Sequence, residues 1–148
     1  MAVRLVLAVL GVSLSMLACG NSGAQGVSPS VATVEIYSGR ENPSWTLDKS
    51  ARSAVAAAMD GLRADDRLKA PDEGRLGFRW IEVTALDTSH GRVTRAKVAP
   101  RIVALELPAD RRTLVLADPE SRTLQELLRH AAGHVDADVL DLIRQQIR

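Results

Sequence analysis

The chain lacks any pair of cysteines. Cys19 is the only cysteine among the 148 residues, so no intramolecular disulfide can form. Stability must therefore come from a buried core, and the length left beyond the N-terminal region suffices for one core of modest size. The sequence predicts a single folded domain over residues 33–148, without internal repeats.

The chain also has no large excess of positive charge. Arg4 is the only charged residue among residues 1–18, so the rest of the chain carries 18 basic and 18 acidic residues. Recognition of nucleic acid relies on a basic surface, and the composition therefore argues against a nucleic-acid partner. Walker, dinucleotide-binding and nucleophile-elbow motifs are absent from the sequence, so we predict no cofactor and assign no catalytic residue.

No apolar run is long enough to span a bilayer, which takes about 20 residues in a helix. The longest run, residues 5–17, follows the positive charge of Arg4 and ends in small residues at Ala18. A short charged start, a brief apolar stretch and a small residue at the cut are typical of a secretory signal peptide. We predict a signal peptide over residues 1–18.

The residues that close this segment, Met16-Leu17-Ala18-Cys19, resemble a bacterial lipobox. The resemblance implies that Cys19 becomes the lipidated first residue of the mature protein, with its acyl chains as a membrane anchor. Acylation also accounts for an unpaired cysteine in an exported chain. The alternative is ordinary signal-peptide cleavage at Ala18 or later. Lipidation predicts a bacterial cell-envelope location, and Gly20 favours the outer membrane facing the periplasm in a Gram-negative cell.

Beyond the anchor, the pattern indicates a tether and an α+β domain. Residues 19–32 are rich in Gly and Ser, and we expect the lipidated cysteine and a flexible tether there. Apolar periodicity then predicts the order β-α-β-β-β-β-α-α, with a mostly antiparallel sheet of about four to five strands packed against helices. The predicted strands are 33–38, 76–86, 92–99, 102–107 and 113–118. The polar strand 92–99 is expected at an edge.

Aspartates mark the predicted helix starts. Asp48 is expected to cap a helix that ends near residue 63, because its carboxylate can accept an orphan backbone N–H. Asp118 followed by proline predicts the start of a second helix, which Gly133 ends. Asp136 or Asp138 is expected to cap the last helix. The apolar residues of strand 76–86 change face partway along, which indicates a β-bulge or burial on both faces.

Two segments resemble an uncharacterised family of small exported bacterial proteins. Residues 38–45, Ser-Gly-Arg-Glu-Asn-Pro-Ser-Trp, are similar to its S-G-R-x-N-P-x-W motif, and residues 76–79, Leu-Gly-Phe-Arg, to the strand that follows its first helix. The resemblance implies one domain that starts near Thr33. It implies no activity.

The loop 38–45 is the first candidate site. Arg40 offers a planar fork of donors for a carboxylate or phosphate, Asn42 offers an amide, and Trp45 offers a ring on which a ligand could stack. The alternative is a structural connector, in which Trp45 packs in the core, Asn42 bonds local backbone and Arg40 pairs with an acid. The second interpretation is favoured.

Glu126, His130 and His134 form a second candidate, a metal site. Their spacing of four residues puts side chains on one helix face, and carboxylate and imidazole groups at that spacing can share a metal ion. The plainer interpretation is stronger, because Gly133 is expected to end the helix before His134. The pattern also lacks the internal glutamate of H-E-x-x-H.

These observations support one leading hypothesis and two alternatives. The leading one is a non-catalytic, lipid-anchored envelope domain that binds a protein partner or a small ligand. One alternative is a metal-dependent hydrolase that uses Glu126, His130 and His134. The other is a structural lipoprotein for envelope assembly, which docks through strand 92–99 or through its closing helices.

Overall fold

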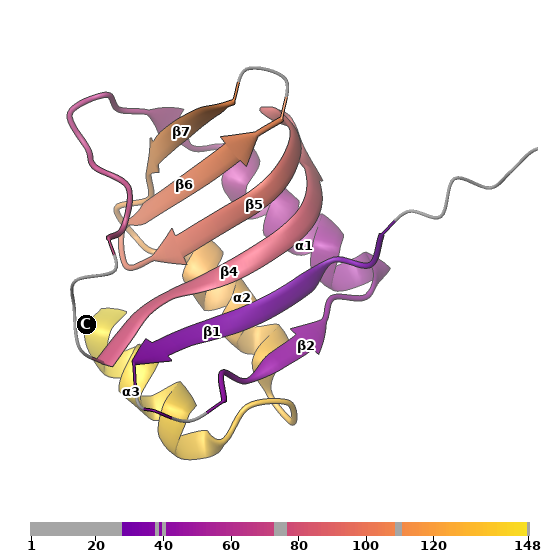
Figure 1. The fold of residues 1–148 in the computed structure, drawn as a ribbon, viewed down its shortest axis with the longest axis vertical. Coiled ribbons are helices and arrows are strands. Elements are labelled where there is room, and N and C mark those ends of the chain that lie inside the picture. Colours follow the sequence, from indigo (N-terminus) through magenta and orange to yellow (C-terminus); the bar gives the residue numbers. More distant parts are fainter. Residues whose placement is uncertain (1–27, 38, 40, 73–76, 109–110, 148) are drawn as a thin grey trace, which may run out of the picture.

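A seven-stranded antiparallel sheet forms the centre of the part of the chain that the structure describes. The structure is a computed structural model, and it describes residues 28–37, 39, 41–72, 77–108 and 111–147. The strand order is β2-β1-β4-β5-β6-β7-β3. Figure 1 shows the sheet, whose strands are β1 (Val31–Tyr37), β2 (Ser44–Thr46), β3 (Arg63–Ala64), β4 (Gly77–Thr88), β5 (Gly91–Ala99), β6 (Ile102–Leu107) and β7 (Arg112–Ala117).

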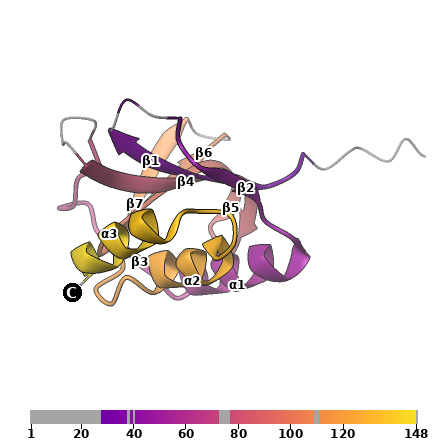
Figure 2. The same ribbon diagram turned by 90° about the horizontal axis from the view of Figure 1, so that it is seen from below.

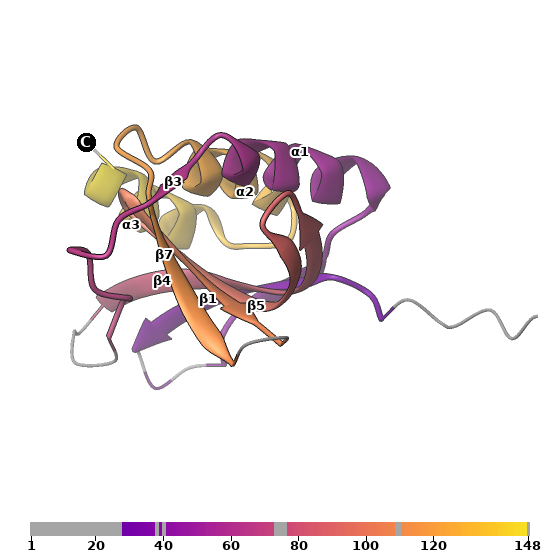
Figure 3. The ribbon, with the colours of Figure 1, turned by 90° about the horizontal axis from the view of Figure 1, so that it is seen from above.

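Three helices, α1 (Lys49–Asp60), α2 (Arg122–Ala131) and α3 (Ala137–Ile147), lie on one face of this sheet. Figure 3 shows the same layering from the other side, with all three above the strands. The core fills the space between the two layers, and its fully buried side chains include Val34, Val55, Met59, Ile81, Val83, Leu105, Leu116, Leu124, Leu127 and Ile143. The α+β class and the one-sided helix layer predicted from the sequence are confirmed. None of the helices in the described ranges has the length and apolar character needed to cross a bilayer.

The sheet has more strands than the four to five predicted. The two additional strands, β2 and β3, are only three and two residues long, too short to show an alternating pattern. β2 pairs with β1, and β3 pairs with β7, so they form the two edges. Short edge strands offer little template for pairing with another chain.

The expected edge position of strand 92–99 is wrong. This segment is β5, which lies inside the sheet between β4 and β6. Val93, Ala96 and Val98 are buried, whereas Arg95 and Lys97 lie on the face opposite the helices. The sequence of this strand is polar because one of its faces is exposed to solvent. Alternating polar and apolar residues occur in interior strands as well as in edge strands, so the pattern does not distinguish the two.

Of the two alternatives for strand 76–86, a β-bulge or burial on both faces, the structure shows the bulge. The register between β1 and β4 shifts between Glu35 and Ile36, which pair with Trp80 and Phe78 respectively. Arg79 is the extra residue, and the bulge lets Phe78 and Ile81 both belong to the core. By alternation along β4, Trp80 then lies on the face away from the helices, together with the cross-strand pair of Glu82 and Lys97.

Aspartate capping is confirmed for α1 and modified for α2. Asp48 Oδ1 accepts a hydrogen bond from Ala51 N at 2.7 Å, as expected. In contrast, α2 begins at Arg122, after the predicted start at Asp118. The Asp118 carboxylate is nevertheless the cap, because it accepts hydrogen bonds from Arg122 N and Thr123 N, both at 2.9 Å. Ser121 makes this reach possible by adopting a left-handed conformation (φ 53°).

Candidate functional site

The sheet has two distinct ends along the direction of β1. At the near end, the described chain enters β1 at Val31, opposite Thr46 of β2. At the far end, Tyr37 pairs with Gly77, so the loop after β1, the start of β4 and the β5–β6 turn lie together. Figure 1 shows these ends on the right and the left of the sheet. Cys19, the predicted lipidation site, lies outside the described residues.

The loop after β1 folds back along the free edge of that strand. Pro43 O accepts a hydrogen bond from Val34 N at 2.9 Å, and Asn42 Oδ1 accepts one from Ile36 N at 3.2 Å. The side chain of Asn42 thus takes the place of a strand carbonyl where β2 does not reach. Its Nδ2 donates to Glu35 Oε2 at 2.9 Å, so both ends of the amide are used.

Glu35 joins the loop after β1 to the start of β4. Besides Asn42, its Oε2 contacts the guanidinium of Arg79 at 3.6 Å. The guanidinium carbon of Arg79 lies 4.8 Å from the centroid of the Trp80 ring, and Lys97 Nζ lies 4.7 Å from it. This Glu35 cluster (Glu35, Asn42, Arg79, Trp80, Lys97) was not predicted as a unit, although Asn42 was a candidate. Its residues come from β1, the following loop, β4 and β5, which no local motif connects.

Trp45, the aromatic residue of the candidate loop, is placed in the core. Its side chain is 5% exposed and belongs to the same buried cluster as Val34 and Val55. The ring therefore stabilises the attachment of β2 and presents no open face to a ligand. Arg40 lies outside the described residues, so its role stays a prediction.

Of the three predicted metal ligands, only Glu126 and His130 lie in contact on one face of α2. Glu126 Oε1 contacts His130 Nε2 at 3.3 Å, and Glu126 Oε2 accepts a hydrogen bond from Arg129 at 2.8 Å. His134 follows the end of α2, in a turn where its backbone N–H donates to Ala131 O. Gly133 has φ 83° just before it, as expected of a residue that ends a helix. Among the described residues, no group of three or more His, Cys, Asp or Glu side chains could hold a metal ion.

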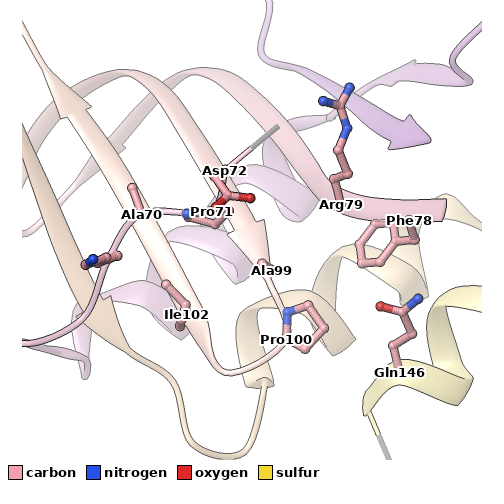
Figure 4. A pocket seen from close by; sticks show the side chains of 10 residues that line it. Ala70, Pro71, Asp72, Phe78, Arg79, Ala99, Pro100, Ile102 and Gln146 are labelled. Carbon is pink, nitrogen blue, oxygen red and sulfur yellow. The ribbon is translucent and has the colours of Figure 1, made fainter. Parts of the chain in front are cut away.

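A cavity of about 560 Å³ opens at the far end of the sheet. Its walls come from the loop before β4, the start of β4, the β5–β6 turn and the last turn of α3, as Figure 4 shows. Polar and apolar groups contribute about equally to its surface, and the apolar residues are Ala70, Pro71, Phe78, Ala99, Pro100 and Ile102. The polar groups around it are carried by Lys69, Asp72, Arg79 and Gln146. Sequence reasoning missed this site because its residues belong to four separate segments.

The loop that forms one wall is attached to the sheet through Asp65. The backbone N–H of Asp65 donates to Val115 O in β7, and its carboxylate accepts hydrogen bonds from Arg67 Nε and Nη2 at 2.9 and 2.8 Å. These hydrogen bonds from Arg67 lower the pKa of Asp65 to about 2. The backbone of the same turn is closed by the Leu68 N–H, which donates to Asp65 O at 3.0 Å.

The chain was compared with protein-family models, with curated proteins and with solved structures. No family model matches it, and no curated protein or solved structure does so either. The functional argument for this chain therefore depends on its own residues and their geometry.

Proposed function

We propose that this protein is a lipid-anchored component of the bacterial cell envelope, whose domain binds a protein partner or a small ligand without catalysis. The observation that carries the proposal is the placement of the cavity and the Glu35 cluster relative to Val31. The chain enters the sheet at one end, and both features lie at or towards the other.

This placement suits a tethered binding domain. Ser30 is buried and bonded to Ala85 and Leu47, so the tether predicted from Cys19 would reach the sheet at Ser30. A flexible stretch of that length would span roughly 15–20 Å, which would keep the domain near the bilayer. The seven residues of β1 separate the two ends of the sheet by about 20 Å, so the cavity lies away from the point of attachment.

The chemistry at the far end favours binding over catalysis. Glu35 is held by Asn42 and Arg79, and Trp80 lies beside Arg79 and Lys97. Side chains that are bound to one another in this way stabilise the shape of the surface. A general acid or base would instead be expected to aim at the place that a substrate occupies.

A pair of cysteine variants tests the proposal. Glu41→Cys places a thiol on the exposed loop at the far end, and Asp87→Cys places one at the exposed near end of β4. Because the proposed acylation consumes the thiol of Cys19, a photoreactive thiol reagent labels only the introduced residue. Labelled protein is irradiated in intact envelopes, and adducts of protein or small-molecule mass are identified by mass spectrometry.

The proposal expects discrete adducts from position 41 and few from position 87. Equal labelling of lipid and bulk protein from both positions would contradict it, as would an absence of adducts from position 41. Separately, membrane fractionation of the unlabelled protein tests the anchor.

A further inference from the structure

We propose that the far-end cavity binds an apolar zwitterion, such as a short peptide with free amino and carboxyl ends. This inference rests on the proposed binding function and assigns its site and ligand class. The assignment follows from three properties of the cavity: its size, the apolar half of its walls and the signs of the charges around it.

The size is that of a small-molecule site. A volume of about 560 Å³ lies within the roughly 300–1,000 Å³ that ligand pockets occupy. Pro71, Phe78, Pro100 and Ile102 contribute to the apolar half of the walls, so a ligand that fills the cavity gains from an apolar part. A purely polar ion would leave these side chains in contact with water and gain nothing from them.

The charges favour a ligand with both signs. Arg79 lines the cavity, but Figure 4 shows its side chain directed away from Phe78 and Gln146, and its guanidinium contacts Glu35. Lys69 and Asp72 then contribute one positive and one negative group. Asp72 would repel a simple anion, and Lys69 would repel a simple cation. A zwitterion can direct its carboxylate to Lys69 and its ammonium group to Asp72.

Hydrogen-bonding capacity supports the same ligand. A carboxylate has about four acceptor sites and can bind an ammonium group in addition to other partners. The amide of Gln146 offers both a donor and an acceptor, which suits the peptide group between two charged ends.

The walls are held before any ligand arrives. The turn that carries Pro100 is attached to the start of α2, because Arg101 N donates to Ser121 Oγ at 2.9 Å and Asp118 N donates to Arg101 O at 3.0 Å. The opposite wall follows the Asp65 turn, which is bound to β7. A preformed cavity loses little conformational entropy on binding, so even a small ligand can bind measurably.

Calorimetric titration of the full lipidated protein in detergent tests the inference. The probes are leucyl-leucine, its N-acetylated form, which lacks the ammonium group, and its C-terminal amide, which lacks the carboxylate. Charge-assisted hydrogen bonds are strong enough that each blocked form should bind about tenfold or more weaker than the free dipeptide. Detergent alone serves as the blank.

Variants assign each charge to its partner. Asp72→Asn should abolish the preference for the free dipeptide over its N-acetylated form, and Lys69→Gln should abolish the preference over the amide. Lys49→Gln is the matched control, since Lys49 lies at the start of α1 and does not line this cavity. It should bind all three probes as the wild type does.

Several results would overturn the inference: no saturable binding of leucyl-leucine, equal binding of the free and blocked forms, or the same loss from Lys49→Gln as from Lys69→Gln. If adducts still form from position 41 while no dipeptide binds, this assignment fails and the proposed function stands. If the dipeptide binds but no adducts form in the envelope, the ligand site stands and the proposed role of the domain in the envelope fails.

Discussion

The side chain of Asn42 donates a hydrogen bond to Glu35 across the edge of β1, at 2.9 Å. The same side chain accepts from the backbone N–H of Ile36, so Asn42 completes the strand edge and orients the carboxylate at once. Glu35 in turn contacts the guanidinium of Arg79, and this guanidinium lies beside the Trp80 ring. A loop residue thereby controls the geometry of the helix-free face of the sheet.

Asn42→Ala should destabilise the domain by roughly 1–3 kcal/mol, because it leaves the Ile36 N–H without its acceptor in a half-buried position. Asn42→Asp keeps an acceptor but places a second carboxylate beside Glu35. Repulsion between the two carboxylates should therefore destabilise Asn42→Asp at neutral pH, and added salt should reduce this loss by screening. Urea unfolding of both variants at low and high salt measures the losses. Wild-type stability of Asn42→Ala would contradict the role assigned to Asn42.

Trp45→Ala should destabilise the fold by roughly 3–5 kcal/mol, since it removes a large aromatic ring from the core. Trp45→Phe should cost less, because most of the apolar volume stays. Denaturant unfolding followed by circular dichroism measures both variants, and Arg40→Ala is expected to lose less than Trp45→Ala. Unfolding of Trp45→Ala at the wild-type midpoint would show that the ring does not stabilise the fold.

Asp118→Ala should cost about 2 kcal/mol, because the 1% exposed carboxylate accepts from two backbone N–H groups at the start of α2. Asp118→Asn retains one acceptor oxygen and should lose less. Hydrogen exchange at Arg122 and Thr123 provides the local readout: both amides should exchange faster in Asp118→Ala. Unchanged protection of the two amides would refute this capping geometry.

Arg67→Ala should raise the pKa of Asp65 from about 2 towards its ordinary value of 3.8. The folded-state pKa lies below the unfolded one, so the stabilising effect of the pair is complete above about pH 4 and disappears as the pH falls through about 2. The Arg67 side chain is 90% exposed, so solvent screening keeps the effect of the pair on stability small. A carboxyl NMR titration of Asp65 in the wild type and in Arg67→Ala measures the shift, and equal pKa values in the two proteins would contradict the pairing.

Cys19→Ser should block acylation and leave unprocessed precursor in the membrane fraction, because the lipidating reaction needs the thiol. Metabolic labelling with a fatty-acid analogue, followed by fractionation, measures both effects. Processed, soluble protein at the wild-type level from the variant would show that ordinary signal-peptide cleavage operates instead.

Local sequence patterns were sufficient to predict the α+β class, the five longer strands β1 and β4 to β7, and the three helices. Alternation in Ile81 and Val83 and the helical spacing of Leu124, Leu127 and Leu128 identify faces that must be buried, and this information is contained in a few neighbouring residues. The carboxylate caps at Asp48 and Asp118 were visible for the same reason, although the exact start of α2 depended on the left-handed Ser121.

Tertiary structure alone decided the strand order, the short edges and the far-end site. β2 and β3 are strands only because β1 and β7 supply their hydrogen-bonding partners, and β5 is interior because β6 pairs with its outer side. Likewise, Glu35 meets Arg79, and Lys69 lines the same cavity as Gln146, through long-range strand pairing and helix packing. Such contacts depend on which distant backbones pair, and periodicity along one segment carries no information about that choice.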